Sequence, residues 1–307
     1  MLFRQLQYLA ALSQERHFGR AADRCHVSQP SLSSGIKQLE FSLQVPIVLR
    51  GRRFMGFTPE GERVVEWAKR VISQRDAMIT ELSQMRENLE GRIRIGAMPN
   101  SSPVLPMFSR KMHDRHPNVD IEIHFLGVEQ TRQGLNSFAL DVGITYVNEE
   151  SISDLSSVPI YTEKFSLLVP EDSQWADMDQ ISWHEAADLP LCLLDASMHE
   201  RRIIDEVFAQ IDRSPSPVVT ASDSILNLIF HVMFADLVTI VPSHFARLPG
   251  GLRGTKEIKL VDPEISREVG LVWSPTEPIM PMAKIATSIC NELCSSGEME
   301  QWFSEAL

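Results

Sequence analysis

A run of polar residues between Ser28 and Lys37 carries the side chains of this chain that are best suited to contact a nucleic acid. Hydroxyl and amide groups can bond phosphate oxygens and base edges, and a glutamine can bond adenine at two positions. The lysine adds a positive charge. Helical spacing brings these side chains onto one exposed face. The candidate contacts in this run are Ser28, Gln29, Pro30, Ser31, Ser33, Ser34 and Lys37.

Two short amphipathic helices must position this face. Small or apolar residues recur every three or four positions over 18–25 and again over 32–43. Between them, Ser28 is a favourable helix N-cap, and Pro30 is tolerated in a first helical turn. Two helices joined by so tight a turn predict a helix-turn-helix, whose second helix enters the DNA major groove. From periodicity alone, an ordinary polar face on a helical hairpin remains the alternative.

Charge separates the first 58 residues from the rest of the chain. They hold eight Lys or Arg and three Asp or Glu, a net charge of +5, whereas the whole chain carries −12, so the other residues carry −17. A basic head on an acidic body favours a head that meets a polyanion. Arg20 lies in this head, and a basic turn between two short strands predicts a wing that contacts phosphate or the minor groove through Arg50, Arg52 and Arg53. A solvated basic loop is the alternative for that turn.

The head resembles the DNA-binding domain of LysR-type transcriptional regulators. The matching residues are Ala21, Ala22, the run from Val27 to Ser33, Ile36, Leu39, Glu40, Leu43 and the Thr58-Pro59-Glu60-Gly61 entry into the family's linker helix. The chain departs from the family's usual Leu, Gly, Leu and Phe at Cys25, Gln44, Ile47 and Val48. These departures concern the packing of the wing more than DNA binding.

The resemblance implies a one-component regulator over the whole chain. Its partners would be double-stranded DNA with an inverted-repeat operator, further copies in a homodimer or homotetramer, and RNA polymerase. The stretch 50–61 additionally resembles regulators associated with formate dehydrogenase genes.

One long helix is expected over residues 59–90. Thr58 is a cap, Pro59 suits a first turn, and apolar residues follow at alternating spacings of four and three, interrupted by Arg75. So narrow an apolar seam on a long helix favours a partner helix and hence a dimer, and a helix folded against its own body is the alternative. The predicted seam residues are Val64, Ala68, Val71, Met78, Leu82 and Met85.

Strand and helix patterns alternate from residue 91 onward and predict parallel sheets with covering helices. The resemblance implies two such units, similar to periplasmic binding proteins. The fold class is therefore a multidomain α/β protein with a winged helix-turn-helix, a linker helix and two Rossmann-like subdomains. The expected boundaries are 1–58 for the head, 59–90 for the linker, 91–162 with 268–307 for subdomain 1, and 163–267 for subdomain 2.

Loops at the carboxyl ends of the predicted strands are the candidate ligand site. Exposed N–H groups at a helix N-terminus near residue 100 suit an anion, and Arg201 and Arg202 could pair with one. We expect a small anionic effector, with a carboxylate as the first candidate, although helix capping or a solvated loop is the alternative for each residue. The candidate contacts are Asn100, Ser101, Ser102, Gln130, Thr131, Thr145, Met198, His199, Thr220 and Ser222.

Other classes of protein are disfavoured. The sequence has no Gly-rich phosphate loop, no Gly-x-Ser-x-Gly and no metal-spaced His/Glu cluster, so we expect neither an enzyme nor a metal site. An architectural DNA protein would not need so large an acidic body. A redox-responsive regulator of the same fold is the remaining alternative, but it needs a reactive cysteine pair in the body, where Cys192 is alone; Cys290 and Cys294, one helical turn apart, are expected to be structural thiols.

Nothing in the sequence predicts a membrane or an export pathway. No run approaches the ~18 apolar residues of a membrane span. The first residues lack the features of a signal peptide and enter a helix at once. We expect a cytoplasmic protein.

Overall fold

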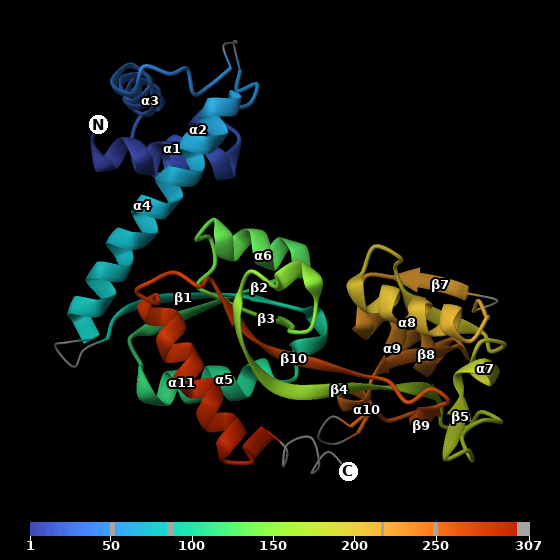
Figure 1. The fold of residues 1–307 in the computed structure, drawn as a ribbon. Helices are drawn as coiled ribbons and strands as arrows, with labels where there is room; N and C mark the ends of the chain where they lie inside the picture. The colour runs from blue at the N-terminus through green and yellow to red at the C-terminus, as the bar shows by residue number, and fades with distance from the viewer. Residues whose placement is uncertain (50–52, 85–88, 216–217, 248–250, 300–307) are drawn as a thin grey trace. The chain divides into compact units, whose positions relative to one another are not determined.

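Two compact units make up the computed structural model (Figure 1), which describes residues 1–49, 53–84, 89–215, 218–247 and 251–299. Unit 1 comprises Met1–Gly91 with the short segment Asn136–Ala139, and unit 2 comprises the remainder. The predicted Arg50, Arg52 and Met85 lie outside the described residues.

Unit 1 is a small helical domain from which a long helix extends. Its elements are α1 (Phe3–Glu15), α2 (Phe18–Arg24), α3 (Gln29–Leu43) and α4 (Pro59–Gln84). The apolar faces of the first three helices and the start of α4 meet in one core. This arrangement confirms the predicted helix-turn-helix. The fully buried side chains include Leu9, Leu12, Ala21, Leu32, Leu39 and Ile47.

Two glycines allow close approaches within this unit. A Cβ on Gly35 would lie 2.7 Å from a ring carbon of Tyr8, so α3 can lie against α1 only with glycine there. A Cβ on Gly61 would lie 2.1 Å from the carbonyl oxygen of Ile47, which places the first turn of α4 directly against the segment that leads into the wing.

Unit 2 is built on one large mixed sheet. The strands run in the order β2-β1-β3-β10-β4-β8-β6-β7, while β9 pairs with β4 and β5 pairs with β9. Their bounds are β1 (Gly91–Ala97), β2 (Val119–Phe125), β3 (Val142–Tyr146), β4 (Ser156–Pro170), β5 (Gln180–Ser182), β6 (Leu191–Leu194), β7 (Val218–Ser222), β8 (Val238–Pro242), β9 (Thr255–Val261) and β10 (Ser266–Trp273).

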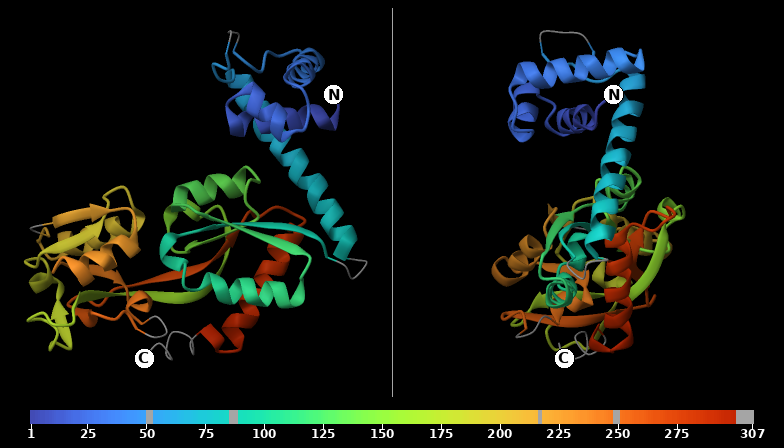
Figure 2. Two further views of the ribbon diagram at one scale, coloured as in Figure 1. Left: turned by 180° about the vertical axis from the view of Figure 1, so that it is seen from behind. Right: turned by 90° about the vertical axis from the view of Figure 1, so that its left-hand side faces the viewer.

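Helices cover the sheet in two groups. Over β1 and β3, α6 covers one face, and α5 and α11 cover the other (Figures 1 and 2). At the opposite end, α8 and α9 pack on β6 and β8. The bounds are η1 (Pro99–Ser101), α5 (Leu105–Arg115), α6 (Val128–Asn136), η2 (Glu150–Ile152), α7 (Trp183–Ala186), α8 (His199–Gln210), α9 (Ile225–Phe234), α10 (Ser243–Ala246) and α11 (Pro281–Ser295).

The long strands β4 and β10 connect the two halves of the sheet (Figure 1). They run antiparallel, with Ser266 opposite Lys164 and Trp273 opposite Ser156. The predicted parallel pairings are present in β1–β3, β6–β7 and β6–β8, and the antiparallel crossing strands make the sheet mixed. The chain leaves subdomain 1 along β4 and returns along β10 beside it, and two such crossings can pair only in opposite directions.

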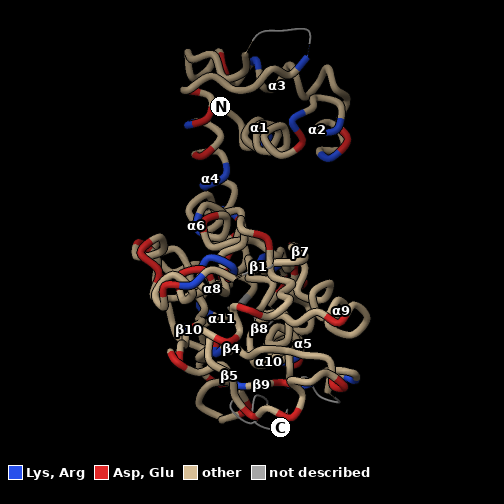
Figure 3. Tube along the Cα trace, turned by 90° about the vertical axis from the view of Figure 1, so that its right-hand side faces the viewer, with Lys and Arg blue, Asp and Glu red and all other residues tan. Residues whose placement is uncertain are grey.

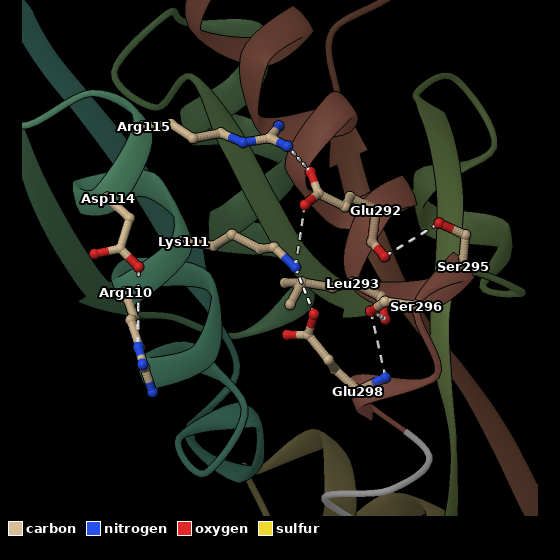
Figure 4. A network of polar contacts seen from close by, with 9 residues as sticks. All are labelled: Arg110, Lys111, Asp114, Arg115, Glu292, Leu293, Ser295, Ser296 and Glu298. Atoms are coloured by element: carbon tan, nitrogen blue, oxygen red, sulfur yellow. Dashed lines mark hydrogen bonds and ion pairs between the residues drawn. The ribbon is translucent and has the colours of Figure 1, made fainter.

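Ion pairs attach α11 to α5 (Figure 4). Lys111 Nζ lies 2.7 Å from Glu298 Oε1 and 3.3 Å from Glu292 Oε1, and Arg115 also pairs with Glu292. These contacts tie α11 to the subdomain that carries α5, and they leave the residues of the cleft described below untouched.

The described residues include neither a membrane-spanning helix nor a cluster of metal ligands. None of the helices there combines the length and the apolar character that crossing a membrane requires. No group of three or more His, Cys, Asp or Glu side chains in those same ranges is arranged to hold a metal ion.

Candidate nucleic-acid interface and ligand cleft

The start of α3 is fixed by its own side chains. Ser28 Oγ accepts the backbone N–H of Ser31 at 3.3 Å, and the two hydroxyls lie 2.8 Å apart. Pro30 occupies the first turn, where a missing N–H costs no hydrogen bond. Leu32, Ile36 and Leu39 point into the core. The opposite face of the helix is consequently exposed over its first two turns.

The predicted contacts of α3 lie on this exposed face, with one exception. The side chains that solvent reaches freely are Ser28, Gln29, Pro30, Ser31, Ser34 and Lys37, whereas Ser33 is half-buried. Ser33 follows the buried Leu32 and lies at the edge of the packed face, so it can reach DNA only over part of its surface.

The basic residues of α2 are partly engaged by an acid. Arg20 donates to the backbone oxygen of Glu15 at 2.7 Å, and Arg24 pairs with the Glu15 carboxylate at 3.1 Å. Both arginines remain more than half exposed, in a region where Figure 3 shows acidic and basic positions together. The guanidinium groups can therefore still reach phosphate while Glu15 limits their rotation.

The wing is positioned by a carboxylate that sequence reasoning left without a role. Glu40 Oε1 accepts the N–H groups of Ile47 at 2.7 Å and Val48 at 3.0 Å. Val48 forms a bridge with Phe57, and Phe54 packs edge-on between aromatic neighbours. The base of the wing is thus ordered by α3 itself. Arg53 is exposed next to it.

The predicted seam of α4 divides into two groups. Ala68 is 1% exposed and Val64 is half-buried, because both pack into the core of the head. Val71, Met78 and Leu82 are exposed, and Met78 and Leu82 are 55% and 51% exposed. Only this second group is available to a partner helix. Trp67 and Ile79 extend the apolar surface.

A buried polar network occupies the cleft of unit 2. Asn100, from η1, directs Nδ2 at both oxygens of Glu163, 2.9 and 2.8 Å away, and at the hydroxyl of Tyr146 at 3.0 Å. The Tyr146 hydroxyl donates to Glu163 Oε1 at 2.5 Å. Tyr146 ends β3 and Glu163 lies on the crossing strand β4. One carboxylate therefore joins three elements of the fold.

Two histidines connect this network to subdomain 2. His244 Nε2, from α10, donates to the backbone oxygen of Asn100 at 2.8 Å. His199 Nε2, from the start of α8, lies 3.1 Å from Glu149 Oε1, and its ring lies 5.3 Å from that of Tyr146. Both contacts run from subdomain 2 to subdomain 1. A rearrangement at this position must change how the two subdomains meet.

Burial sets the protonation of the network. It raises the pKa of Glu163 to about 8, against the opposing hydrogen bond from Tyr146. Burial also raises the pKa of Glu200, and it lowers the pKa of His244 to about 4. At neutral pH the interior is consequently occupied by a largely protonated Glu163 and a neutral His244.

Several of the predicted effector residues make local hydrogen bonds and take no part in the Glu163 network. Ser101 Oγ donates to the Met98 oxygen at 2.7 Å, and Ser102 Oγ donates to the Pro99 oxygen. Gln130 Oε1 accepts the N–H of Gly127 at the start of α6. Gln130 is therefore a capping residue at an exposed position, whereas both serine protons are used within the turn.

Thr131, on α6, and Thr145, on β3, are fully buried, and neither hydroxyl has a hydrogen-bond partner among the described residues. A Cβ on Gly143 would lie 2.4 Å from Thr131 Cγ2, so Thr131 packs beneath α6. Thr145 shares the face of Gly143, since side chains alternate along a strand. The neighbouring Tyr146 points the other way, into the cleft. Contact of Thr131 and Thr145 with an effector stays a prediction.

The predicted residues of subdomain 2 are also spread out. Met198 precedes α8 and packs against the apolar cluster around Leu228. Thr220 and Ser222 lie on β7, the last strand of the sheet order. Hydrogen bonds of the described residues join neither of them to the Glu163 network. Of the predicted contacts, the structure therefore brings together Asn100 and His199, which both adjoin Tyr146.

The basic residues expected to bind an anion are also engaged. Arg201 donates to Asp205 at 2.8 Å and to the Leu194 oxygen at 2.8 Å. Arg202 lies 3.3 Å from His199 Nδ1 and is exposed.

Sequence reasoning missed Tyr146, Glu163, Glu200 and His244. One signal was available: on β4, Tyr161, Glu163 and Phe165 alternate with Thr162 and Lys164. A period of two places the glutamate on the same face as two aromatic residues, which marks it as an inward-facing charge. The burial of His244 depends on the distant η1 segment and left no local signal.

The cysteines are all free thiols. Cys192 is fully buried on β6, and burial raises its pKa to about 11. Burial likewise raises the pKa of Cys25, Cys290 and Cys294. The reactive form of cysteine is the thiolate, so these environments disfavour rapid oxidation.

Comparison with known proteins covers both units. Residues 3–62 match the bacterial regulatory helix-turn-helix proteins of the lysR family, and residues 86–294 match the LysR substrate binding domain. The chain is 30% identical over 282 residues to the DNA-binding transcriptional dual regulator OxyR of Escherichia coli strain K12, which covers 91% of each protein. It is also 30% identical to the hydrogen peroxide-inducible genes activator of Pectobacterium carotovorum, over 91% of this chain and 92% of that protein.

Solved structures show the same architecture. A full-length OxyR variant from Pseudomonas aeruginosa aligns with a TM-score of 0.75 at 26% identity, over 96% of each chain. Full-length CbnR in complex with its target DNA aligns with a TM-score of 0.68 at 18% identity, over 95% of this chain and 99% of that one. These similarities confirm the predicted fold class, a helix-turn-helix joined to a two-subdomain α/β body.

Proposed function

This chain belongs to the LysR-type transcriptional regulators, and from that premise we propose that it binds an inverted-repeat operator as an oligomer and responds to a small effector in the cleft of unit 2. The observation that carries the DNA-binding part is the exposed polar face at the start of α3, opposite a fully buried apolar face. Contacts from this face would read bases, and Arg20, Arg53 and the other wing arginines would bind the phosphate backbone.

The proposed dimer uses the exposed part of α4. Val71, Met78 and Leu82 recur at spacings of seven and four and are 40%, 55% and 51% exposed. Apolar residues at this spacing suit a coiled-coil contact with a second α4. A two-fold dimer would present two heads to two half-sites, which is why we propose an inverted-repeat operator.

A homotetramer is supported by apolar patches at both ends of the sheet. Phe125 is exposed on β2, the first strand in the sheet order, and Val219 is exposed on β7, the last. On α9, which packs beside β7, the residues Leu226, Phe230 and Phe234 form an exposed apolar stripe. A two-fold pairing of unit 2 that sets the β2 end of one copy against the β7 end of another would cover both patches.

The effector would act by changing how the two subdomains meet. The network from Asn100 through Glu163 to Tyr146 and His244 spans the crossing strands, so a ligand that breaks it favours a different arrangement. Ligand can shift only states for which its affinities differ. In an oligomer on DNA, such a shift would alter the spacing of the heads, the bending of the operator and the contact with RNA polymerase. Since its partner is chromosomal DNA, the proposed site of action is the cytoplasm.

The class of effector was expected to be anionic, with a carboxylate first, and that remains a prediction. Its remaining support is the exposed Arg202 and the partly exposed Arg201. An association with formate dehydrogenase genes is likewise a hypothesis, and it rests on the stretch 50–61, of which residues 50–52 lie outside the described ranges.

A redox-responsive regulator is the second candidate, because the relatives named above include hydrogen peroxide-inducible activators. The thiols of this chain provide no support for it, since burial raises the pKa of Cys192 and of the other three cysteines.

The test of DNA binding is fluorescence anisotropy with the DNA upstream of the chain's own gene and with a shuffled DNA of equal composition. We expect the upstream DNA to bind at least roughly 10³-fold more tightly at physiological salt. Raising salt from about 50 to 200 mM should weaken both complexes. Equal affinity for the two DNAs would contradict a sequence-specific regulator.

A further inference from the structure

The interior of the cleft holds two buried carboxylates. Glu163 and Glu200 are 1% and 3% exposed. Among the described residues, no Lys, Arg or His side chain is one of the groups that set the pKa of Glu163, whereas His199 and Arg202 oppose the rise in the pKa of Glu200. A buried carboxylate is costly unless it is paired with a cation or neutralised by a proton. The free protein uses the proton, and a ligand could supply the cation.

An acceptor without a donor lies at the same place. Asn100 is 0% exposed, and its Nδ2 faces three oxygens of Glu163 and Tyr146. The reversed amide would set oxygen against these oxygens, so the orientation is fixed by its surroundings. In the described part of the chain, Asn100 Oδ1 has no hydrogen-bond partner. Buried polar atoms are nearly always bonded, so this acceptor is free to take a donor that a ligand brings.

A cavity of about 280 Å³ lies against Tyr146, which contacts both Asn100 and Glu163. A water molecule occupies ~30 Å³ in the liquid, so the cavity suits a ligand of a few heavy atoms. Two carboxylates and one guanidinium line it, and that guanidinium lies 3.8 Å from Glu206. Tyr146 belongs both to the cavity wall and to the Glu163 network. The lining residues are Tyr146, Asn148, Glu149, Ser266, Arg267 and Glu268.

We propose that the effector of this cleft is a small organic cation with several N–H donors, either a primary amine or a guanidinium compound, whose donors bind Glu163 and Asn100 Oδ1. This inference rests on the proposed function and names the ligand class for the same site. The ligand enters from the cavity past Tyr146 and replaces the hydrogen bonds that Tyr146 and Asn100 make to Glu163. The contact from His244 to Asn100 then couples binding to subdomain 2.

Binding of a cation also changes the protonation of Glu163. Burial holds its pKa near 8, and a positive charge next to the carboxylate favours the ionised form. At pH 7 the bound ligand should therefore release up to one proton to solvent. The titratable groups that face Glu163 are Tyr146 on β3, Tyr161 on β4, His199 and Glu200 on α8, and His244 on α10.

The test is isothermal titration calorimetry of the full-length protein at pH 7 in phosphate and in MOPS, neither of which is a primary amine. The probes are ethylamine, 1,4-diaminobutane and agmatine, with formate, acetate and succinate as anionic counterparts. We expect at least one amine or guanidinium compound to bind, and the carboxylates not to bind. The observed heat should differ between the two buffers, because they take up the released proton with different enthalpies.

Two variants identify the binding group. Glu163→Gln keeps the shape of the side chain but cannot ionise, and it should weaken amine binding at least roughly tenfold and remove the buffer dependence. Glu150→Gln changes an exposed carboxylate outside the Glu163 network and should leave both unchanged. Thermal unfolding of each variant shows whether it is folded. If Glu163→Gln is not folded, the proposal is decided by the wild-type protein alone. Its heat of amine binding must then differ between the two buffers.

Three results would overturn the assignment: binding of a carboxylate and of no amine, binding of no compound in the panel, or amine binding that Glu163→Gln does not weaken. None of these three results would bear on specific DNA binding by the ligand-free protein, which the fluorescence anisotropy experiment measures separately. A failure of the effector class and a failure of the proposed function are therefore distinguishable.

Discussion

The hydroxyl of Tyr146 donates to Glu163 Oε1 over 2.5 Å, which ties the end of β3 to the strand that crosses between the two subdomains. Asn100 contacts the same carboxylate, and His244 of subdomain 2 donates to the backbone oxygen of Asn100. The junction of the subdomains is therefore a hydrogen-bonded network rather than a purely apolar contact. A ligand that competes for these hydrogen bonds would favour another arrangement of the subdomains.

The raised pKa of Glu163 predicts that the stability of unit 2 falls as pH rises. Its pKa in the fold is about 8, against an ordinary value of 4.5, so the folded state holds more protons than the unfolded state between these values. The stabilisation is complete below pH 4.5 and is lost as pH rises through 8. His244 acts in the opposite direction, because its pKa is lowered from 6.5 to about 4 and stability is gained between those values.

The contributions of Glu163 and His244 to stability can be separated above pH 6.5 because, of these two groups, only Glu163 titrates there. Between pH 6.5 and 8 we expect Glu163 to account for a loss of roughly 2 kcal/mol in the free energy of unfolding. Urea unfolding followed by the fluorescence of the buried Trp183 at these two pH values measures it. Glu163→Gln should remove most of the loss, and Glu150→Gln should keep it. A loss of the same size in Glu163→Gln would refute this origin.

Gln29→Ala should weaken operator binding in a base-dependent way. The side chain is exposed at the start of α3, where a glutamine can bond both positions of an adenine. We expect a loss of about 1–3 kcal/mol on the operator and little change on shuffled DNA. Ser42→Ala lies at the other end of α3 and is the control, since its hydroxyl already donates to Leu39. Equal weakening on both DNAs would assign Gln29 to phosphate contact instead.

Glu40→Ala should loosen the wing. Its carboxylate accepts two backbone N–H groups, from Ile47 and Val48, and both would lose this partner. We expect unit 1 to lose about 1–3 kcal/mol of stability and DNA binding to weaken for every sequence. Hydrogen exchange of residues 1–84, measured in the full-length protein at increasing temperature, reports the loss of stability in unit 1. Glu62→Ala, on the exposed side of α4, is the control, and identical protection of Ile47 in wild type and Glu40→Ala would argue against the assignment.

Replacing the exposed apolar residues of α4 with charged ones should dissociate the oligomer. Met78→Glu combined with Leu82→Glu places two charges in the proposed helix–helix contact, where they would be desolvated. Light scattering should report a smaller oligomer over a wide range of protein concentration. Asp76→Asn changes the charge on a different face of the helix and should leave the mass unchanged. An unaltered mass in the double variant would exclude this seam as the interface.

Hydrogen peroxide should not change DNA binding. Burial raises the pKa of Cys192 to about 11, so almost none of it is thiolate at pH 7. Operator affinity measured before and after peroxide treatment should agree for the wild-type protein and for Cys192→Ser. A peroxide response that Cys192→Ser abolishes would restore the redox-responsive alternative.

The parts of the fold that could be predicted from the sequence depend on local signals. The helix-turn-helix follows from the Ser28 cap, Pro30 and the helical spacing of Leu32, Ile36 and Leu39, all within a few residues of one another. The mixed sheet could not be predicted in the same way. It depends on the pairing of β4 with β10, whose paired residues are about a hundred positions apart.

The cleft was predicted only in part for the same reason. Asn100 was expected from its place after β1, but its partner Glu163 lies on a strand whose inward face is decided by the order of the whole sheet. Tyr146 was missed although it neighbours the predicted Thr145, because a shift of one residue on a strand reverses the face. Glu40 was part of the recognised motif, yet its contact with Ile47 becomes visible only in three dimensions.

Footprinting on the DNA upstream of the chain's own gene tests the central claim most directly. It should be performed at two salt concentrations, without ligand and with each amine and carboxylate of the panel. We predict a protected inverted repeat whose length or position changes when one of the amine or guanidinium compounds is added and does not change with the carboxylates. A footprint that no compound alters would contradict control by the cleft, and protection that ignores sequence and disappears with salt would contradict the specific regulator itself.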